Sequence, residues 1–155
     1  MKEKQWLGPE KCAGCDQLKT TYHILFQCPI AVYLWPFLRN SLGWLRSPTS
    51  CVEFFSELLE AVRGKKKQKA TLFICVGAMW TIWKTRNDVV FNEKLLSSPQ
   101  AIIFKTLILI KSWSPLVKPK LKLVADEMIS LLSTNAKFRL PGLFGSVSFA
   151  LSSWE

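Results

Sequence analysis

Three cysteines and the only histidine of the chain lie close together near its N-terminus. Cys12, Cys15, His23 and Cys28 form the pattern C-x2-C-x7-H-x4-C. Zinc prefers four ligands in a tetrahedron, and thiolate sulfur and imidazole nitrogen are its usual ligands in structural sites. Two cysteines separated by two residues can hold one ion from a tight turn, which Gly14 suits because glycine adopts positive φ without steric cost. The spacing therefore predicts a zinc site.

The predicted zinc site is closed, because protein side chains fill all four positions and leave none for water or substrate. We expect the ion to stabilise residues 6–28, which have too little apolar surface to fold alone. The side chains expected to pack around it are Trp6, Leu18, Tyr22, Leu25 and Phe26. The alternative is that the cysteines are unrelated and that His23 is a core residue. Cys51 and Cys75 lie on apolar faces of expected helices and are interpreted as inert.

The N-terminus and the cysteine content indicate a reducing compartment. Residues 1–6 carry charges where a signal peptide would have an apolar stretch. Five cysteines in a chain without an export signal favour metal binding over a disulfide framework. The longest apolar-rich run, residues 70–83, is shorter than the roughly 20 residues of a membrane span. We therefore expect an intracellular protein, nuclear or cytoplasmic, that is not secreted and has no membrane partner.

Length and composition favour one compact unit built from helices. The chain has 155 residues, of which 49% are hydrophobic and 12% aromatic, enough to fill the core of a single domain. From Pro29 onward the apolar residues recur with the 3.6-residue period of a helix. We predict an all-α fold with a small zinc knuckle (1–28), a domain of four or five helices (29–133) and a loosely ordered tail (134–155). The predicted helices cover residues 30–42, 50–63, 70–92, 98–113 and 119–133.

The third predicted helix is apolar on most sides, so we expect it to be central, with Gly77 leaving room for a neighbour. Residues 65–69 are interpreted as a basic connector before it. Ser50 and Glu53 form a capping box for the second helix, and Ser97 or Ser98 is expected to cap the fourth. The side chains expected on the buried faces are, for the first helix, Val32, Trp35, Leu38 and Leu42 and, for the second, Phe55, Leu58, Leu59 and Val62. For the third helix they are Phe73, Val76, Trp80, Trp83 and Val90. For the fourth they are Ile103, Leu107, Ile110 and Trp113, and for the fifth Leu121, Val124, Met128 and Leu131.

Two separated segments resemble one known family. Residues 12–35 contain the cysteines and histidine followed by Trp35, and residues 79–92 read MWTIWKTRNDVVFN. Together they resemble the zinc-binding domain C-terminal to the reverse transcriptase of plant LINE-type (non-LTR) retrotransposon proteins. The resemblance covers roughly residues 6–92 and implies that the four predicted ligands bind zinc. One departure is the segment 19–21, which reads KTT where the family usually carries an acidic residue.

The proteins that carry this domain are enzymes, but their catalytic motifs are missing from this chain. Polymerases and ribonuclease H domains hold two metal ions with clustered carboxylates. The aspartates here, Asp16, Asp88 and Asp126, are scattered along the sequence. The single histidine is already assigned to the metal. We therefore expect this chain to have no catalytic activity.

The excess of basic residues indicates an acidic partner. The formal net charge is +10, and five of the seven residues 63–69 are basic: Arg63, Lys65, Lys66, Lys67 and Lys69. Such a cluster binds phosphates without sequence preference, so RNA or DNA is the expected partner. Lys118, Lys120 and Lys122 form a second, sparser set, and Trp6 or Phe26 are candidates for stacking on unpaired bases. The alternative is a solvated basic loop that only keeps the protein soluble.

Two further interpretations stay open at the level of sequence. In one, the zinc only fixes the N-terminal segment, and the tryptophan-rich helices pack against a partner such as other parts of a reverse transcriptase. In the other, the chain is a degenerate retroelement relic without activity.

Overall fold

The computed structural model describes residues 11–12, 15–44, 47, 50–92, 94, 98 and 100–139. The predicted all-α class is confirmed, since all regular elements in these residues are helices apart from one isolated bridge between Lys11 and Leu18. The elements are the π-helix η1 (His23–Gln27), α1 (Pro29–Leu42), α2 (Cys51–Ala61), α3 (Lys65–Asn92), α4 (Ala101–Trp113), the 3-10 helix η2 (Ser114–Leu116) and α5 (Pro119–Arg139).

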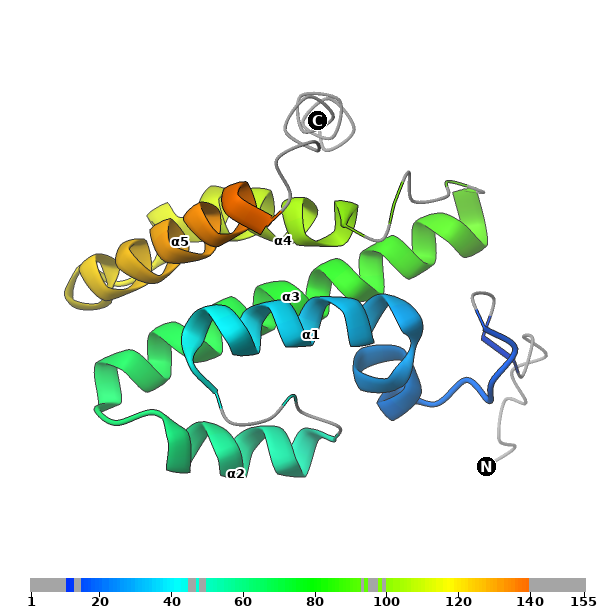
Figure 1. The fold of residues 1–155 in the computed structure, drawn as a ribbon, viewed down its shortest axis with the longest axis horizontal. Coiled ribbons are helices and arrows are strands. Elements are labelled where there is room, and N and C mark those ends of the chain that lie inside the picture. The colour runs from blue at the N-terminus through cyan, green and yellow to red at the C-terminus, as the bar shows by residue number, and fades with distance from the viewer. Residues whose placement is uncertain are drawn as a thin grey trace, which may run out of the picture.

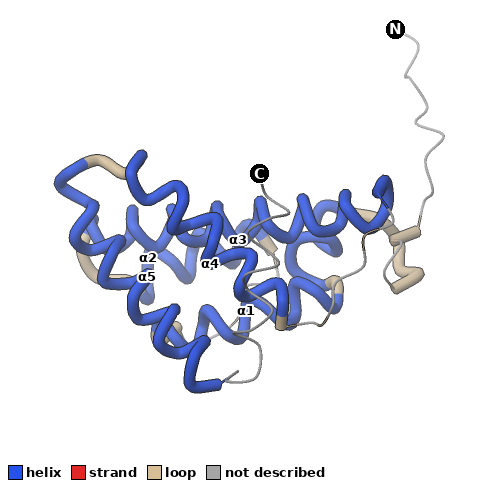
Figure 2. Tube along the Cα trace, turned by 90° about the horizontal axis from the view of Figure 1, so that it is seen from above, coloured by secondary structure: helices blue, strands red, loops and turns tan. Residues whose placement is uncertain are grey.

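The helix α3 is the centre of the molecule, as its apolar sequence predicted. It has 28 residues, a length of about 42 Å, and it contacts η1 and all four other α-helices. Figure 1 shows α2 on one side of α3, with α4 and α5 on the other, and α1 contacts α3, α4 and α5. Figure 2 shows the same bundle from above, with the loop that leads into η1 (tan) at one end. The largest fully buried core side chains are Trp35, Leu34, Leu38, Ile74, Ile82, Ile102, Ile110 and Leu132.

Most helix ends follow the local signals in the sequence. At the start of α2, the Ser50 hydroxyl accepts a hydrogen bond of 3.2 Å from the backbone N–H of Glu53, as expected of a capping box. The helix α1 ends at Gly43, whose φ of 75° is a left-handed conformation that glycine adopts readily. The cap predicted for α4 was wrong for Ser98, because Gln100 is the N-cap and its side chain makes no capping hydrogen bond; Ser97 lies outside the described residues. Ser98 instead accepts the N–H of Ala101 with its backbone carbonyl.

Two helices are longer than the sequence pattern predicted. The basic residues 65–69 are the first turns of α3 rather than a connector, because lysine favours helix and Gly64 supplies the turn with a φ of 94°. The backbone N–H of Gln68 bonds to the Gly64 carbonyl at 3.0 Å. At the other end of the chain, α5 continues past residue 133 to Arg139, and Ala136 is fully buried in the core. Residues 140–155 of the predicted tail lie outside the described residues.

Three of the four positions predicted to be buried on α4, Ile103, Leu107 and Ile110, are in the core. The fourth, Trp113, is partly exposed. In three other helices one predicted position is exposed because the packed face is rotated relative to the predicted one. The exposed residues are Val32 in α1, Phe55 in α2 and Leu131 in α5, and the side chains buried close to them are Ala31, Phe54 and Leu132. The side chains of Leu58 and Leu59 lie outside the described residues.

The largest error concerns α3, where the predicted positions Val76, Trp80 and Trp83 are 48%, 45% and 44% exposed. The face that packs carries smaller side chains, among them Ala70, Ile74, Cys75, Ala78, Thr81 and Ile82. Small side chains face inward because α3 is surrounded by other helices, whose side chains pack closely against it. Gly77 shows how close, since a Cβ built there would be 2.5 Å from Cγ2 of Ile110. The room that glycine was predicted to leave is therefore occupied by α4.

Candidate metal centre

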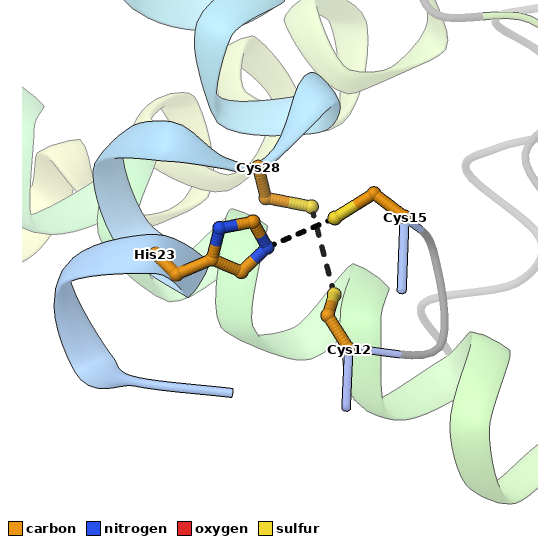
Figure 3. A group of neighbouring side chains, drawn as sticks. All are labelled: Cys12, Cys15, His23 and Cys28. Carbon is orange, nitrogen blue, oxygen red and sulfur yellow. Dashed lines mark hydrogen bonds between the residues drawn. The ribbon is translucent and has the colours of Figure 1, made fainter. Parts of the chain in front are cut away.

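The four predicted ligands, Cys12, Cys15, His23 and Cys28, come together at one end of the molecule (Figure 3). One ligand atom from each lies within 4.8 Å of all the others. The Sγ atoms of Cys12 and Cys28 are 3.9 Å apart, close to the roughly 3.8 Å that a tetrahedron with zinc–sulfur bonds of 2.3 Å requires. Cys15 Sγ and His23 Nε2 are 3.0 Å apart, about half an ångström closer than that tetrahedron. The group is therefore close enough to hold one metal ion.

The first pair of ligands is held by a tight turn at the start of the described chain. The carbonyl of Cys12 accepts the backbone N–H of Asp16 at 3.1 Å, and the N–H of Cys12 bonds to the Gln17 carbonyl at 2.7 Å. The left-handed residue of this turn is Asp16, with a φ of 60°. Aspartate is among the few residues other than glycine that adopt this conformation. Gly14, expected to supply the turn, lies outside the described residues.

The second pair of ligands depends on an element that the sequence analysis missed. His23 and Cys28 are five residues apart, which on an α-helix would place them about 140° apart around the axis. The chain between them is instead the π-helix η1, and the N–H of Cys28 bonds to the His23 carbonyl at 2.6 Å. The wider π turn brings residues i and i+5 to the same side, and π turns recur at functional sites. The H-x4-C spacing was the only sequence signal for it.

Cys28 also begins the helix α1, because it is the N-cap and Pro29 follows it. The backbone N–H of Ile30 bonds to the Cys28 thiol and favours its thiolate. Burial outweighs this effect and, with the nearby Cys12 and Cys15, raises the pKa of Cys28 to about 12. A divalent cation reverses the balance, since a coordinated thiol loses its proton. The positive end of the α1 dipole acts in the same direction.

The metal-binding segment is attached to the helical core through Trp35. The indole N–H of Trp35 donates a hydrogen bond of 2.7 Å to the carbonyl of Leu25 in η1. The rings of Phe26 and Trp35 stack with centroids 5.7 Å apart, and both side chains are buried. Phe26 is therefore not exposed for base stacking, which corrects that expectation.

The apolar cluster expected around the metal is smaller than predicted. Phe26 is buried and Leu25 packs partly against the core. Leu18 and Tyr22 are 69% and 49% exposed, so the prediction for them was wrong. The hydrophobic core of the bundle takes the supporting role that the sequence analysis gave to them. Trp6 lies outside the described residues.

The predicted nucleic-acid-binding residues lie far from the metal centre. Arg63, Lys65, Lys66, Lys67 and Lys69 are exposed around the start of α3, at the opposite end of the molecule from the cysteines (Figure 1). The fold brings Lys118 and Lys120 to the same end, because α5 begins there. A shallow groove between the first turn of α3 and the middle of α5 is lined by Lys65, Lys66, Lys67 and also by Glu127.

The three aspartates considered for catalysis lie on separate elements. Asp16 is in the turn of the metal centre, Asp88 is on α3 and Asp126 is on α5. Asp126 accepts a hydrogen bond of 2.7 Å from the Ser114 hydroxyl and lies 3.3 Å from Lys122. These partners lower the pKa of its carboxyl group. Asp126 therefore stabilises the turn between α4 and α5.

The described part of the chain contains no helix with the length and apolar character that crossing a membrane would require. Comparison of the sequence and the structure with protein-family models, curated proteins and solved structures found no match.

Proposed function

We propose that the chain is a structural zinc-binding module without catalytic activity of its own, and that it binds RNA or DNA non-specifically through its basic end. The observation that carries the first part is the convergence of four protein ligand atoms within 4.8 Å of one another. Three thiolates and one imidazole are a donor set that suits zinc, because hard cations such as magnesium and calcium prefer oxygen ligands.

The role of the zinc is to join the turn around Cys12 and Cys15 to the helical bundle. The turn around Cys12 and Cys15 contains little apolar surface, whereas Cys28 belongs to a helix of the core. An ion bound by both connects the turn to the bundle, so its binding free energy adds to the folding free energy of residues 11–28. A closed site of this kind stabilises structure and leaves no position for a substrate.

A cobalt titration tests the proposed metal chemistry. Cobalt(II) added to chelator-treated protein should give the visible absorption of a tetrahedral ion and the near-ultraviolet absorption of thiolate ligands, and zinc should displace it. Cys28→Ser should weaken both signals, whereas Cys51→Ser, at a cysteine outside the cluster, should leave them intact. An octahedral cobalt spectrum in the unmodified protein would contradict a tetrahedral site.

The nucleic-acid part of the proposal rests on charge. The basic end, defined as Arg63, Lys65, Lys66, Lys67, Lys69, Lys118 and Lys120, gathers exposed cations from two segments about fifty residues apart. Exposed lysines and arginines neutralise phosphates and release the counterions that these hold, which makes the affinity strongly dependent on salt. The net charge of +10 acts in the same direction by attracting polyanions at long range.

A salt titration tests the basic end. Lys66→Glu should weaken binding to a labelled duplex DNA. It should also reduce the slope of log Kd against log salt concentration by about one or more, which is the contribution of one phosphate contact. Lys94→Glu is the matched control, since it reverses one exposed charge past the opposite end of α3. Equal effects of the two variants would show that net charge alone attracts nucleic acid, and the basic end would then not be a binding surface.

The retroelement origin is a separate part of the proposal, supported by the resemblance of residues 12–35 and 79–92. His23, Cys28 and Trp35 of the first segment act together physically, because the indole of Trp35 holds the π-helix that presents two ligands. A second candidate function, a protein-interaction module, is favoured by the exposure of Trp80 and Trp83 on α3. A fall in self-association on replacing these two residues by serine would support this second candidate.

A further inference from the structure

A row of aromatic rings lies exposed along α3 and the end of α4. The ring centroids of Trp80 and Trp83 are 5.1 Å apart, and those of Trp80 and Trp113 are 6.5 Å apart. Trp80 and Trp83 are each more than two-fifths exposed, and Trp113 is partly exposed. We call these three residues the aromatic row. Large flat rings in this position are costly to leave in water and are well suited to stacking.

The aromatic row ends beside a groove that carries positive charge. The groove has a volume of about 390 Å³ and is lined by Lys69, Ala70, Phe73, Trp113, Leu116, Val117, Lys118 and Leu121. Its aromatic side chains come from α3 and α4, and its two lysines come from α3 and the turn before α5. A flat apolar group that carries anions is the ligand that this lining complements.

The same face of α3 joins the row to the basic end. Lys65, Lys69, Val76, Trp80 and Trp83 follow one another at intervals of three, four or seven residues, so they share one face of the helix. All five side chains are exposed. Cations therefore occupy the first turns of this face, and indole rings occupy its middle.

We propose that this face binds single-stranded nucleic acid, with bases stacked on the aromatic row and phosphates bound by Lys65, Lys69 and Lys118. The proposal rests on the proposed function and specifies which form of nucleic acid the module takes. Cations that bind the phosphate backbone, combined with aromatic rings on which bases stack, are the usual features of surfaces that bind single strands without sequence preference. In a duplex the base faces are already stacked on one another, so the row would have nothing to bind.

Charge complementarity favours this occupant over a protein. A protein partner for an apolar helix face would gain from the indoles but would have to supply acidic groups to match the lysines at one end of the face and in the groove. A polynucleotide supplies both components in a regular repeat, because each nucleotide has one flat base and one phosphate.

The test compares variants of the full chain in binding to a labelled oligouridylate and to a labelled duplex DNA. Trp80→Leu combined with Trp83→Leu keeps apolar bulk but removes the flat rings. We expect this variant to lose roughly tenfold or more in affinity for the single strand and to keep its affinity for the duplex. The double tyrosine variant at the same positions should recover most of the loss, because it restores aromatic planes. Phe55→Leu, at an exposed ring on α2, is the control.

The outcomes separate this inference from the proposed function. If Lys66→Glu changes neither affinity, the nucleic-acid part of the proposed function fails. If Lys66→Glu weakens binding but the double leucine variant keeps full affinity for the single strand, the stacking surface is overturned while the basic end stands. If the double leucine variant only lowers self-association, the row is a protein interface and the inference is wrong. Circular dichroism of each variant checks that the helices are intact.

Discussion

The environment of Cys28 determines how the metal centre responds to pH. Burial raises the pKa of this thiol from 9.0 to about 12 in the metal-free protein. A thiol whose pKa is higher in the folded state contributes stability that is present below pH 9 and is lost as the pH rises toward 12. With zinc bound the thiolate is the bound form, so this loss should disappear.

We therefore expect chelator-treated protein to lose stability above about pH 9 more steeply than zinc-loaded protein. Denaturant unfolding at several pH values with and without zinc measures this difference. The Cys28→Ala variant should lack this component in chelator, because it has no thiol at that position. An identical pH dependence of chelated wild type and Cys28→Ala would contradict the assigned cause.

Asp16 is the residue that closes the turn between the first two cysteines, with a φ of 60°. Asp16→Gly should keep or slightly improve zinc affinity, because glycine adopts this conformation at no cost. Asp16→Val should lose about 1–2 kcal/mol of zinc-binding free energy, because a β-branched residue is strained at positive φ. Competition with a chromophoric zinc chelator measures both affinities. A valine variant that binds as tightly as wild type would show that the turn tolerates another conformation.

At the scale of single residues, the sequence predicted that Cys12, Cys15, His23 and Cys28 form one group, but not what packs around them. The group could be inferred directly because cysteine and histidine at such spacing are typical of metal sites. The packing around them could not, because Leu18 and Phe26 are equally apolar and only the fold decides which one reaches the core.

Two of the four candidate ligands, His23 and Cys28, are positioned by η1 and the start of α1, and Trp35 couples these two helices. Trp35→Phe should keep the stacking with Phe26 but remove the 2.7 Å hydrogen bond to the Leu25 carbonyl. We expect a loss of about 1–3 kcal/mol in unfolding free energy, since the carbonyl loses its donor, together with weaker zinc binding. Trp44→Phe is the control, because Trp44 packs against Trp35 at a tilt. Equal losses in the two variants would remove the special role of the hydrogen bond.

The contact between α3 and α4 depends on Gly77. Gly77→Ala should destabilise the protein by about 1–3 kcal/mol, because the new methyl group would overlap Cγ2 of Ile110. Ile110→Ala removes that atom, so the double variant should cost less than the sum of the two single variants. Denaturant unfolding of the wild type, the two single variants and the double variant gives the coupling free energy between the two positions. Additive effects would mean that the helices move apart without cost.

Helical periodicity predicted the elements well but could not predict η1 or the packed face of α3. A π-helix differs from an α-helix by a single inserted residue, and no side chain in the segment 23–27 marks the insertion. The helix α3 has apolar residues on two faces, and the face with the larger side chains was predicted to be buried. The face with small side chains is buried instead, because close packing of several helices leaves too little space for large ones.

The whole molecule separates its two candidate functions along α3. The metal centre lies at one end of α3 and the basic end at the other (Figure 1). Trp80 and Trp83 of the aromatic row are in the middle of α3 and are exposed. The sequence showed the two basic segments but not that they meet, because their proximity depends on the reversal of the chain between α4 and α5. Charge and composition predict attraction to a polyanion, and only the fold shows which side chains share a surface.

The most direct test of the central claim, that one ion is bound by Cys12, Cys15, His23 and Cys28, is the metal content of the purified protein. Elemental analysis should find about one equivalent of zinc per chain, most of it lost in Cys28→Ser. Cys51→Ser should keep the zinc, because Cys51 lies outside the cluster. The absence of bound zinc from the wild-type protein, or its full retention in Cys28→Ser, would contradict the account.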